Sequence, residues 1–204
     1  MSEEDILDLV KKDKWMMDIL RAAESLNLPD WWIGAGFVRS KVWDHQHAYK
    51  KRTPLPDVDL IYFDKSDFSK DETGNFSTKA EDKYQDLLNK HKQLCVKWSV
   101  TNQARMHIYH NRAPYRNCEE ALSEWAETAT CVGARSNKGK LSLIAPYGVK
   151  DLVKLILRPI PEYKEKFAFD PDTFERRIRK KKWLQKWPKL KIALGSHPWG
   201  AKLD

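Results

Sequence analysis

Hydrophobic residues recur with helical spacing near the start of the chain and with strand spacing further along. In Ser2–Asn27 they fall on one side of a helix, which we expect to pack on the following sheet. The apolar run Trp31–Ile33 predicts a short strand, and the alternating run Asp57–Phe63 predicts a second one. A further strand is expected at Leu94–Val100, and a hairpin on either side of Asn137–Gly139.

A glycine turn and a helical pattern separate the first two predicted strands. Gly34 and Gly36 follow the first strand, where glycine lets the backbone approach a ligand closely. The free amides at the start of the following helix attract anions such as phosphates. Arg39 lies in the first turn of this helix, where its charge opposes the helix dipole. A phosphate at the turn would give it a partner, and a surface salt bridge is the alternative.

A pair of carboxylates is the main candidate for chemistry. Asp57 and Asp59 are two residues apart on a predicted strand, so both lie on one face while Val58 and Leu60 point into a core. Neighbouring carboxylates repel each other, and a bound cation would remove that conflict. Mg²⁺ prefers oxygen ligands together with substrate phosphates. The pair therefore predicts a site for Mg²⁺ or Mn²⁺, and a plain exposed strand face is the alternative.

The order of these features resembles a known superfamily. A strand, a glycine turn, a helix and a strand with Asp-x-Asp form the signature of nucleotidyltransferases built around the palm of DNA polymerase beta. Gly36–Arg39 is similar to the Gly-x-Val-Arg turn of tRNA nucleotidyltransferases. Within Leu28–Pro161, successive blocks resemble a bacterial group of nucleotidyltransferase-like proteins: IGAGFVRSKVWD, TPLPDVDLIYFD, WSVTNQARMH, ETAT and APYGVKDL.

This resemblance implies an α+β palm fold, with a mixed sheet flanked by helices, to which the residue patterns add an N-terminal helical segment and a basic C-terminal helix. It also implies a nucleoside triphosphate as substrate, whose nucleoside monophosphate passes to an acceptor with release of pyrophosphate. Asp57 and Asp59 would be the catalytic, metal-holding residues. Gly34 and Gly36 would cradle the triphosphate, helped by Arg39.

Two polar residues after the third predicted strand are further candidates for nucleotide binding. Asn102 can donate and accept hydrogen bonds, and Arg105 can bind a phosphate with two nitrogens. Their place at a strand-to-helix junction could face the nucleotide. The alternative is a loop brace, in which they satisfy backbone groups.

The superfamily usually takes a third carboxylate from the strand beside Asp-x-Asp, and this chain departs from that pattern. The corresponding positions are Cys95, Lys97 and Ser99, and none is acidic. Three possibilities remain open. The site works with two aspartates, Glu127 or another acid supplies the third, or the protein binds nucleotide or RNA with little or no turnover.

The composition of the chain indicates a cellular compartment and shows that its positive charge is unevenly distributed. The 204 residues contain three cysteines without C-x-x-C spacing, no secretory leader and no long apolar run, so we expect a cytoplasmic protein without a membrane anchor. The net charge of +8 arises at the C-terminal end, where Arg176–Lys202 holds ten Lys or Arg and no acid. We expect residues 1–161 to form the nucleotidyltransferase-like domain and residues 162–204 a basic helical extension packed on it.

The basic extension predicts a helix from about Pro171 to Lys186, with Phe174, Ile178 and Leu184 inward. Tryptophans are interleaved with its charges, at positions 183, 187 and 199. Basic residues mixed with aromatics are typical of surfaces that bind single-stranded nucleic acid. RNA bound through Arg176–Lys202 is therefore one interpretation, and an amphipathic helix with a solvated basic face is the other.

Overall fold

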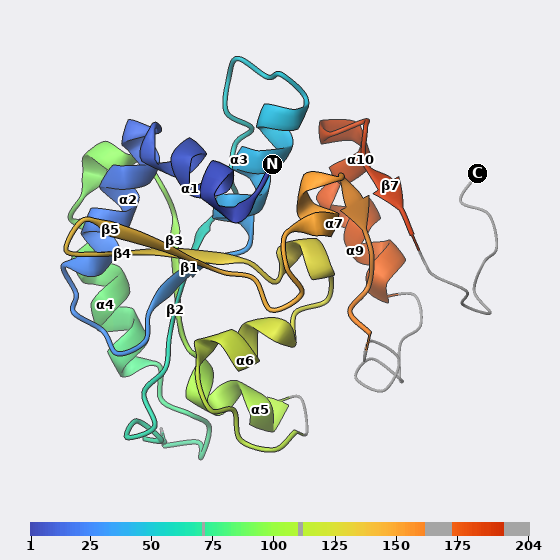
Figure 1. The fold of residues 1–204 in the computed structure, drawn as a ribbon. Helices are drawn as coiled ribbons and strands as arrows, with labels where there is room; N and C mark the ends of the chain where they lie inside the picture. Colours follow the sequence, from blue (N-terminus) through green and yellow to red (C-terminus); the bar gives the residue numbers. More distant parts are fainter. Residues whose placement is uncertain (71, 110–111, 162–172, 194–204) are drawn as a thin grey trace.

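A five-stranded mixed sheet forms the centre of the protein (Figure 1). The computed structural model describes residues 1–70, 72–109, 112–161 and 173–193. The strands are β1 (Trp32–Gly34), β2 (Val58–Tyr62), β3 (Trp98–Asn102), β4 (Gly133–Asn137) and β5 (Lys140–Ile144), in the order β3-β2-β1-β4-β5. Strands β2 and β3 are parallel, and the other neighbouring pairs are antiparallel. The α+β class expected from the sequence is confirmed.

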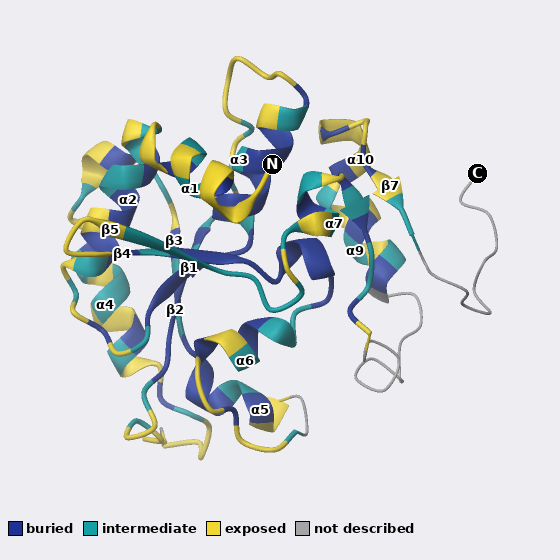
Figure 2. Ribbon diagram, in the orientation of Figure 1, coloured by how far each residue is buried: buried dark blue, intermediate teal, exposed yellow. Residues whose placement is uncertain are grey.

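Helices pack on both faces of this sheet (Figure 2). They are α1 (Glu3–Lys11), α2 (Lys14–Glu24), α3 (Gly36–Gln46), α4 (Lys79–Asn89), α5 (Met106–Tyr109), α6 (Cys118–Ser123), α7 (Lys150–Val153), α9 (Thr173–Lys181) and α10 (Trp183–Lys186). A small parallel sheet joins β6 (Ile156–Leu157) to β7 (Lys191–Ile192). The expected N-terminal helical segment is thus two helices, because Asp13 has extended backbone angles and caps α2 by accepting from the Met16 amide.

The central strand β2 contributes to two apolar cores, one on each face. Val58, Leu60 and Tyr62 belong to the larger core, which also contains side chains of α1, α2 and α3. Ile61 and Phe63 belong to the smaller core, on the side of α6. Since side chains alternate along a strand, Asp59 lies on the same face as Ile61 and away from the larger core.

The predicted strands are confirmed, but two of them begin later than predicted: the first hairpin strand is expected at Thr130–Arg135 and is Gly133–Asn137. The hairpin of β4 and β5 forms as expected, and Lys138 and Gly139 take positive φ values of 50° and 80° in its turn. Strand β3, however, begins at Trp98 and not at Leu94. Lys92–Leu94 instead form a 3₁₀ turn, and Cys95 then adopts left-handed backbone angles, which interrupt the extended pattern.

The C-terminal helices pack into the larger core and are shorter than predicted. Helix α9 ends at Lys181, and Lys182 has left-handed angles before α10 begins. Phe174 and Ile178 are buried as expected, but Leu184 is exposed, because this break rotates α10 relative to α9. The buried side chains of both helices share one core with α3, and the division into residues 1–161 and 162–204 stays a prediction.

Hydrogen bonds join α3 to the segment after α10. The indole nitrogen of Trp187 donates to Asp44 over 2.7 Å, and the Lys189 amide donates to His47 over 3.0 Å. Asp44 also accepts from the Thr53 amide and hydroxyl. These bonds hold the C-terminal helices against the helix that follows the glycine turn. Within the described ranges, no helix has the length and apolar character needed to cross a membrane.

Candidate active site

The two aspartates lie side by side at the start of β2. Asp57 immediately precedes the strand and Asp59 is its second residue, and both are half-buried, whereas Val58 and Leu60 between and after them are buried. Burial raises the pKa of Asp59, and the negative charge of Asp57 raises it further. The predicted alternation is therefore confirmed, and it creates the charge conflict that a divalent cation would relieve.

Ser99 occupies the position beside Asp59 on the neighbouring strand. In the parallel β2–β3 pair Asp59 lies opposite Ser99, and a hydrogen bond from this side chain acts to lower the pKa of Asp59. The adjacent strand thus offers a hydroxyl and no carboxylate, as the sequence predicts. No group of three or more His, Cys, Asp or Glu residues that could hold a metal ion occurs in the described part of the chain.

The glycine turn lies next to the acid pair. Pairing of Ile33 with Leu60 brings Gly34 beside Asp59, and a Cβ on Gly34 would lie 3.9 Å from the Asp59 carbonyl oxygen. The same Cβ would lie only 3.1 Å from the Trp125 ring, so packing against Trp125 is one reason for a glycine here. The left-handed φ of the turn, 35°, belongs to Ala35, and α3 begins at Gly36. The start of α3 therefore lies close to the aspartates.

Arg39 is buried beneath the C-terminal helices. Its side chain is 6% exposed and stacks on the rings of Trp43 and Trp183, with its guanidinium carbon 5.1 and 4.6 Å from their centroids. Burial lowers the pKa of Arg39 to about 10, and the opposite charge that counters this most is Glu127, followed by Asp59 and Asp57. Its Nε has no hydrogen-bond partner among the residues described. A surface salt bridge is excluded, because Arg39 is not at the surface.

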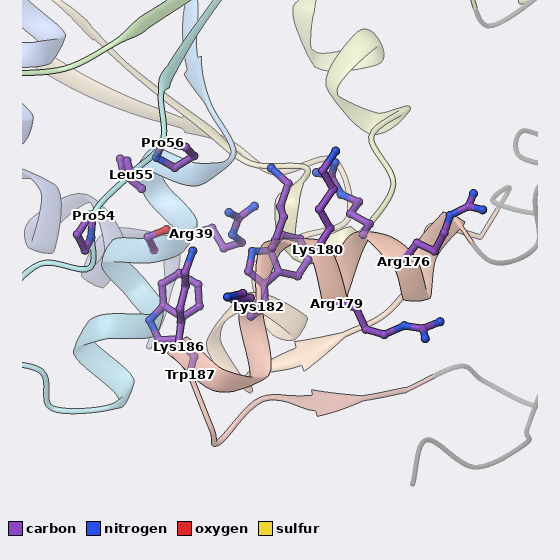
Figure 3. Close-up of a pocket in the computed structure, with 14 residues that line it drawn as sticks. Arg39, Pro54, Leu55, Pro56, Arg176, Arg179, Lys180, Lys182, Lys186 and Trp187 are labelled. Atoms are coloured by element: carbon purple, nitrogen blue, oxygen red, sulfur yellow. The ribbon is translucent and has the colours of Figure 1, made fainter.

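A large basic cavity opens beside Arg39 (Figure 3). Its volume is ≈ 990 Å³, and it lies between Pro54–Pro56 and helices α9 and α10. Eight of the described lining residues are Lys or Arg and none is acidic; the eight are Arg39, Arg176, Arg177, Arg179, Lys180, Lys181, Lys182 and Lys186. Such a concentration of positive charge favours a polyanionic ligand.

Lys181 connects this cavity to the acid pair. It lines the cavity, and its positive charge also acts on Asp59. Burial lowers the pKa of Lys181, and the cations Arg177 and Arg39 lower it further, whereas Asp57 and Asp59 oppose the shift. The sequence did not single out Lys181 or Arg177. Their spacing of four residues on a predicted helix places them on one face and was the available signal.

Glu127, a candidate for the third carboxylate, is engaged elsewhere. It is fully buried, Nε of Arg177 lies 2.6 Å from its Oε1, and the Thr130 hydroxyl donates to its Oε2 over 2.9 Å. The charges that act most on Asp59 are Asp57, Lys181 and Arg39. Glu127 is therefore a buried counter-ion of Arg177 and also acts on the charge of Arg39.

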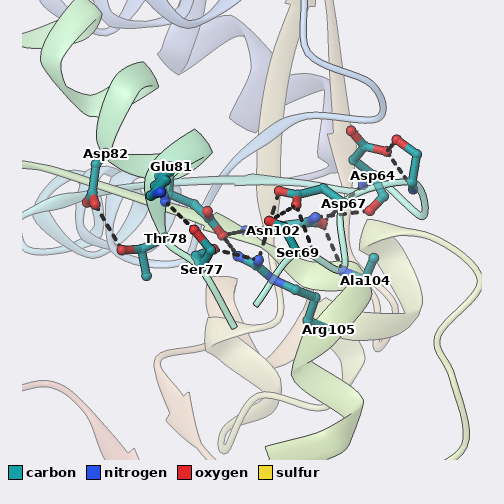
Figure 4. Close-up of polar contacts among 12 residues, drawn as sticks. Asp64, Asp67, Ser69, Ser77, Thr78, Glu81, Asp82, Asn102, Ala104 and Arg105 are labelled. Carbon is teal, nitrogen blue, oxygen red and sulfur yellow. Dashed lines mark hydrogen bonds and ion pairs between the residues drawn. The ribbon is translucent and has the colours of Figure 1, made fainter. Parts of the chain in front are cut away.

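Asn102 and Arg105 lie at and beyond the carboxyl end of β2, whereas the aspartates lie at its start. Figure 4 shows the polar contacts of both residues. Asn102 pairs with Tyr62 at the carboxyl end of β2. Its side-chain Oδ1 accepts from the backbone amides of Asp64 and Ala104, and its Nδ2 donates to the Asp64 carbonyl. Arg105 forms an ion pair with Glu81 and donates to the Ser77 carbonyl. These contacts match the loop-brace alternative, so the structure does not bring Asn102 and Arg105 together with the aspartates.

The tryptophans of the basic segment are not exposed for base stacking. Trp183 and Trp187 are each 2% exposed and pack edge-on against Trp43, with centroid distances of 5.7 and 5.0 Å. Trp199 lies outside the described residues. Base stacking, which belongs to the nucleic-acid interpretation of this segment, is therefore excluded for Trp183 and Trp187 as they lie in this structure, and their burial matches the alternative of a docked amphipathic helix. What the segment contributes to the cavity is its positive charge.

Asp59→Asn is expected to stabilise the protein in EDTA at pH 7 by about 1 kcal/mol. The pKa of Asp59 is raised from 3.8 in the folded state, so the unfolded chain loses this proton at lower pH than the folded chain does. The free energy of unfolding therefore falls as pH rises from the pKa of Asp59 in the unfolded chain to its pKa in the folded protein. It stays reduced at higher pH. Asparagine has no proton to lose. Urea unfolding at pH 7 and at pH 3.5 should show a gain at pH 7 that shrinks at pH 3.5, and a loss at pH 7 contradicts this.

Comparison with known proteins agrees with this geometry. Residues 21–192 match a family model described as Nucleotidyltransferase. An NMR structure described as revealing a CCA-adding enzyme head domain is 30% identical to this chain, with a TM-score of 0.75, and the match covers 95% of this chain and 97% of that one. A search of curated proteins gave no match.

Two larger enzymes share the fold at lower identity. The Thermotoga maritima CCA-adding enzyme complexed with tRNA_CCA is 14% identical with a TM-score of 0.54, over 94% of this chain and 43% of that one. A CCA-adding enzyme complexed with CTP is 14% identical with a TM-score of 0.57, over 93% and 43%. The family model spans the acid pair, the glycine turn and the cavity helices, and the chain accordingly belongs to the nucleotidyltransferase family.

Proposed function

We propose that this protein transfers a nucleoside monophosphate from a nucleoside triphosphate to an acceptor and releases pyrophosphate. The observation that carries the proposal is the position of the acid pair, which lies beside a glycine turn and next to a cavity lined by eight cations. Carboxylates suit a divalent metal, and the cations suit a polyphosphate. Family membership supports the reaction class.

The donor set fits Mg²⁺ or Mn²⁺ held by Asp57 and Asp59. Mg²⁺ is commonly bound by one or two carboxylates, with substrate phosphates and water completing its shell. Burial raises the pKa of Asp59 and the charge of Asp57 raises it further, and a divalent cation would relieve this conflict. When bound, the metal would neutralise phosphate charge and lower the pKa of the attacking hydroxyl.

The remaining residues of the site bind and orient the substrate. We assign the triphosphate to the start of α3 at Gly34 and Gly36, and to Arg39 and Lys181 on the cavity side. Arginine binds phosphate oxygens through two nitrogens, while lysine acts as a point charge. Asn102 and Arg105 are left out of this site, because their side chains are engaged at and beyond the carboxyl end of β2.

An RNA acceptor is the version of this proposal that the basic segment favours. The described part of Arg176–Lys202 places seven of its cations around the cavity. Phosphate contacts of this kind bind nucleic acid with a strong dependence on salt. A protein with the same fold has been seen bound to tRNA, which supports testing tRNA first.

The rival proposal is a protein that binds nucleotide without turnover. It is favoured by Ser99, which stands where a third carboxylate is usual in the superfamily resembled by this sequence. Calorimetry with each triphosphate and Mg²⁺, run beside a pyrophosphate-release assay with tRNA, separates the two. Binding with metal-dependent release supports transfer, binding without release supports the rival, and the lack of both contradicts both.

A further inference from the structure

Glu127 connects two arginines that come from distant parts of the chain. Its carboxylate is 0% exposed and lies 2.6 Å from Nε of Arg177 on α9. It is also the strongest opposite charge acting on Arg39, which belongs to α3. Both arginines line the basic cavity. One buried carboxylate thus pairs with Arg177 and also acts on the charge of Arg39.

Arg177 contacts Glu127 through Nε, so its two terminal nitrogens are not used in this contact. Arginine carries five N–H donors, one on Nε and four on the two terminal nitrogens. Contact through Nε uses one edge of the guanidinium, and within the described residues Arg177 forms no other ion pair. The terminal nitrogens can therefore bind phosphate oxygens in the cavity.

Burial makes this arrangement rigid. Oε2 of Glu127 accepts the Thr130 hydroxyl over 2.9 Å, and Oε1 is held by the ion pair with Arg177 Nε, which has no hydrogen-bond geometry. The short 3₁₀ turn Thr128–Thr130 that follows Glu127 is buried and fixes its backbone. A carboxylate held in this way resists reorientation, because its removal from these partners would leave buried charge uncompensated.

We infer that Glu127 is a positioning residue for the polyphosphate: it holds Arg177 at the cavity, balances the charge of Arg39 nearby, and does not bind the metal. This inference rests on the proposed function, whose substrate it describes more closely. Glu127 acts through the two arginines and has no contact with the reacting atoms. The expected ligand of the pair is the β,γ end of a nucleoside triphosphate, which inorganic tripolyphosphate imitates.

Simple electrostatics and the positioning role predict opposite changes in polyphosphate affinity when Glu127 loses its charge. Removing a negative charge close to a polyanion should tighten its binding by simple electrostatics. Positioning predicts the opposite, so Glu127→Gln should weaken tripolyphosphate binding in EDTA, measured by calorimetry, by about tenfold, the value of one charge-assisted contact. Binding by Glu127→Gln that is unchanged or tighter would overturn the inference, as would the absence of tripolyphosphate binding by the parent protein.

Two further variants make the test independent of folding. Arg177→Lys keeps the charge at a partly exposed position but lacks Nε, and we expect it to weaken tripolyphosphate binding several-fold; unchanged binding overturns the inference. Glu175→Gln is the matched control, since Glu175 on the same helix pairs with Arg179, another cavity residue. The control should bind at least as tightly as the parent protein, as simple electrostatics predicts, and a tenfold loss in it would overturn the specific role of Glu127.

The metal readout separates this inference from the proposed function. In folded Glu127→Gln, the Mg²⁺ concentration that gives half-maximal pyrophosphate release should equal that of the parent, while KM for the triphosphate rises. A large increase in the required Mg²⁺ would make Glu127 a metal ligand and overturn the inference. If the parent releases no pyrophosphate, the proposed function fails, but the metal-free binding results still decide the role of Glu127.

Discussion

Replacing Asp57 and Asp59 together by Asn is expected to lower the rate of pyrophosphate release at least about 10³-fold. The two carboxylates share one face at the start of β2 and are our candidates for holding the divalent metal. Such a metal contributes several kcal/mol of charge stabilisation, and each 1.36 kcal/mol changes a rate about tenfold. Asparagine keeps the shape of the side chain but cannot supply the charge.

Unfolding can be excluded as the cause of this loss. Asp59→Asn is expected to stabilise the metal-free protein, so the double variant should remain folded by circular dichroism. It should also still bind tripolyphosphate in EDTA, because the cavity cations are unchanged. Asp82→Asn with Asp86→Asn removes the same charge from the exposed side of α4 and should retain full activity. If the Asp57 and Asp59 double variant transfers nucleotide as fast as the parent, the proposed mechanism is wrong.

Trp183→Ala is expected to cost about 3–5 kcal/mol of the free energy of unfolding. Its side chain is 2% exposed, packs edge-on against Trp43 and lies under the guanidinium of Arg39. Alanine would remove that ring, loosen α10 from α3 and leave Arg39 without one of its two stacking partners. Urea unfolding measures the first effect, and calorimetry with tripolyphosphate on the folded protein measures the second, a weaker affinity.

The neighbouring residue supplies the control for Trp183. Leu184 is 40% exposed, and Leu184→Ala should change the free energy of unfolding by less than about 0.5 kcal/mol. Trp183→Phe keeps an aromatic face and should lose less than Trp183→Ala in both measurements. Equal stability of Trp183→Ala and Leu184→Ala would mean that α10 does not hold the cavity wall.

Local patterns in the sequence were sufficient for the centre of the fold. The alternation through Asp57–Phe63 fixes both the strand and the shared face of the aspartates, because side-chain direction in a strand has a period of two. The Asn137–Gly139 turn identifies the β4–β5 hairpin, since two of its residues take positive φ. The glycine turn could be placed for the same reason: each of these features depends on a few consecutive residues.

Features that depend on distant residues could not be predicted in this way. Thr78 and Glu81 have the spacing of a capping box, yet the Thr78 side chain makes no cap bond and Glu81 pairs with Arg105. The sequence predicts a solvated or RNA-binding face for the basic run of α9, and the structure adds that this run forms one wall of a cavity. What decides this is the left-handed residue Lys182, which turns Trp183 toward α3. The spacing of hydrophobic residues does not predict a left-handed residue at this position.

The cavity is lined by α3 and by α9 and α10, which are far apart in the sequence. This has a consequence for the stability of the protein. A polyphosphate held between these helices acts as a non-covalent cross-link between two stretches of chain, and it can do so only while both are docked. By mass action, a ligand at 100 times its Kd adds about 2.7 kcal/mol to the stability of the docked state. The cellular level of such a ligand would then influence how long the protein survives, as well as how fast it works.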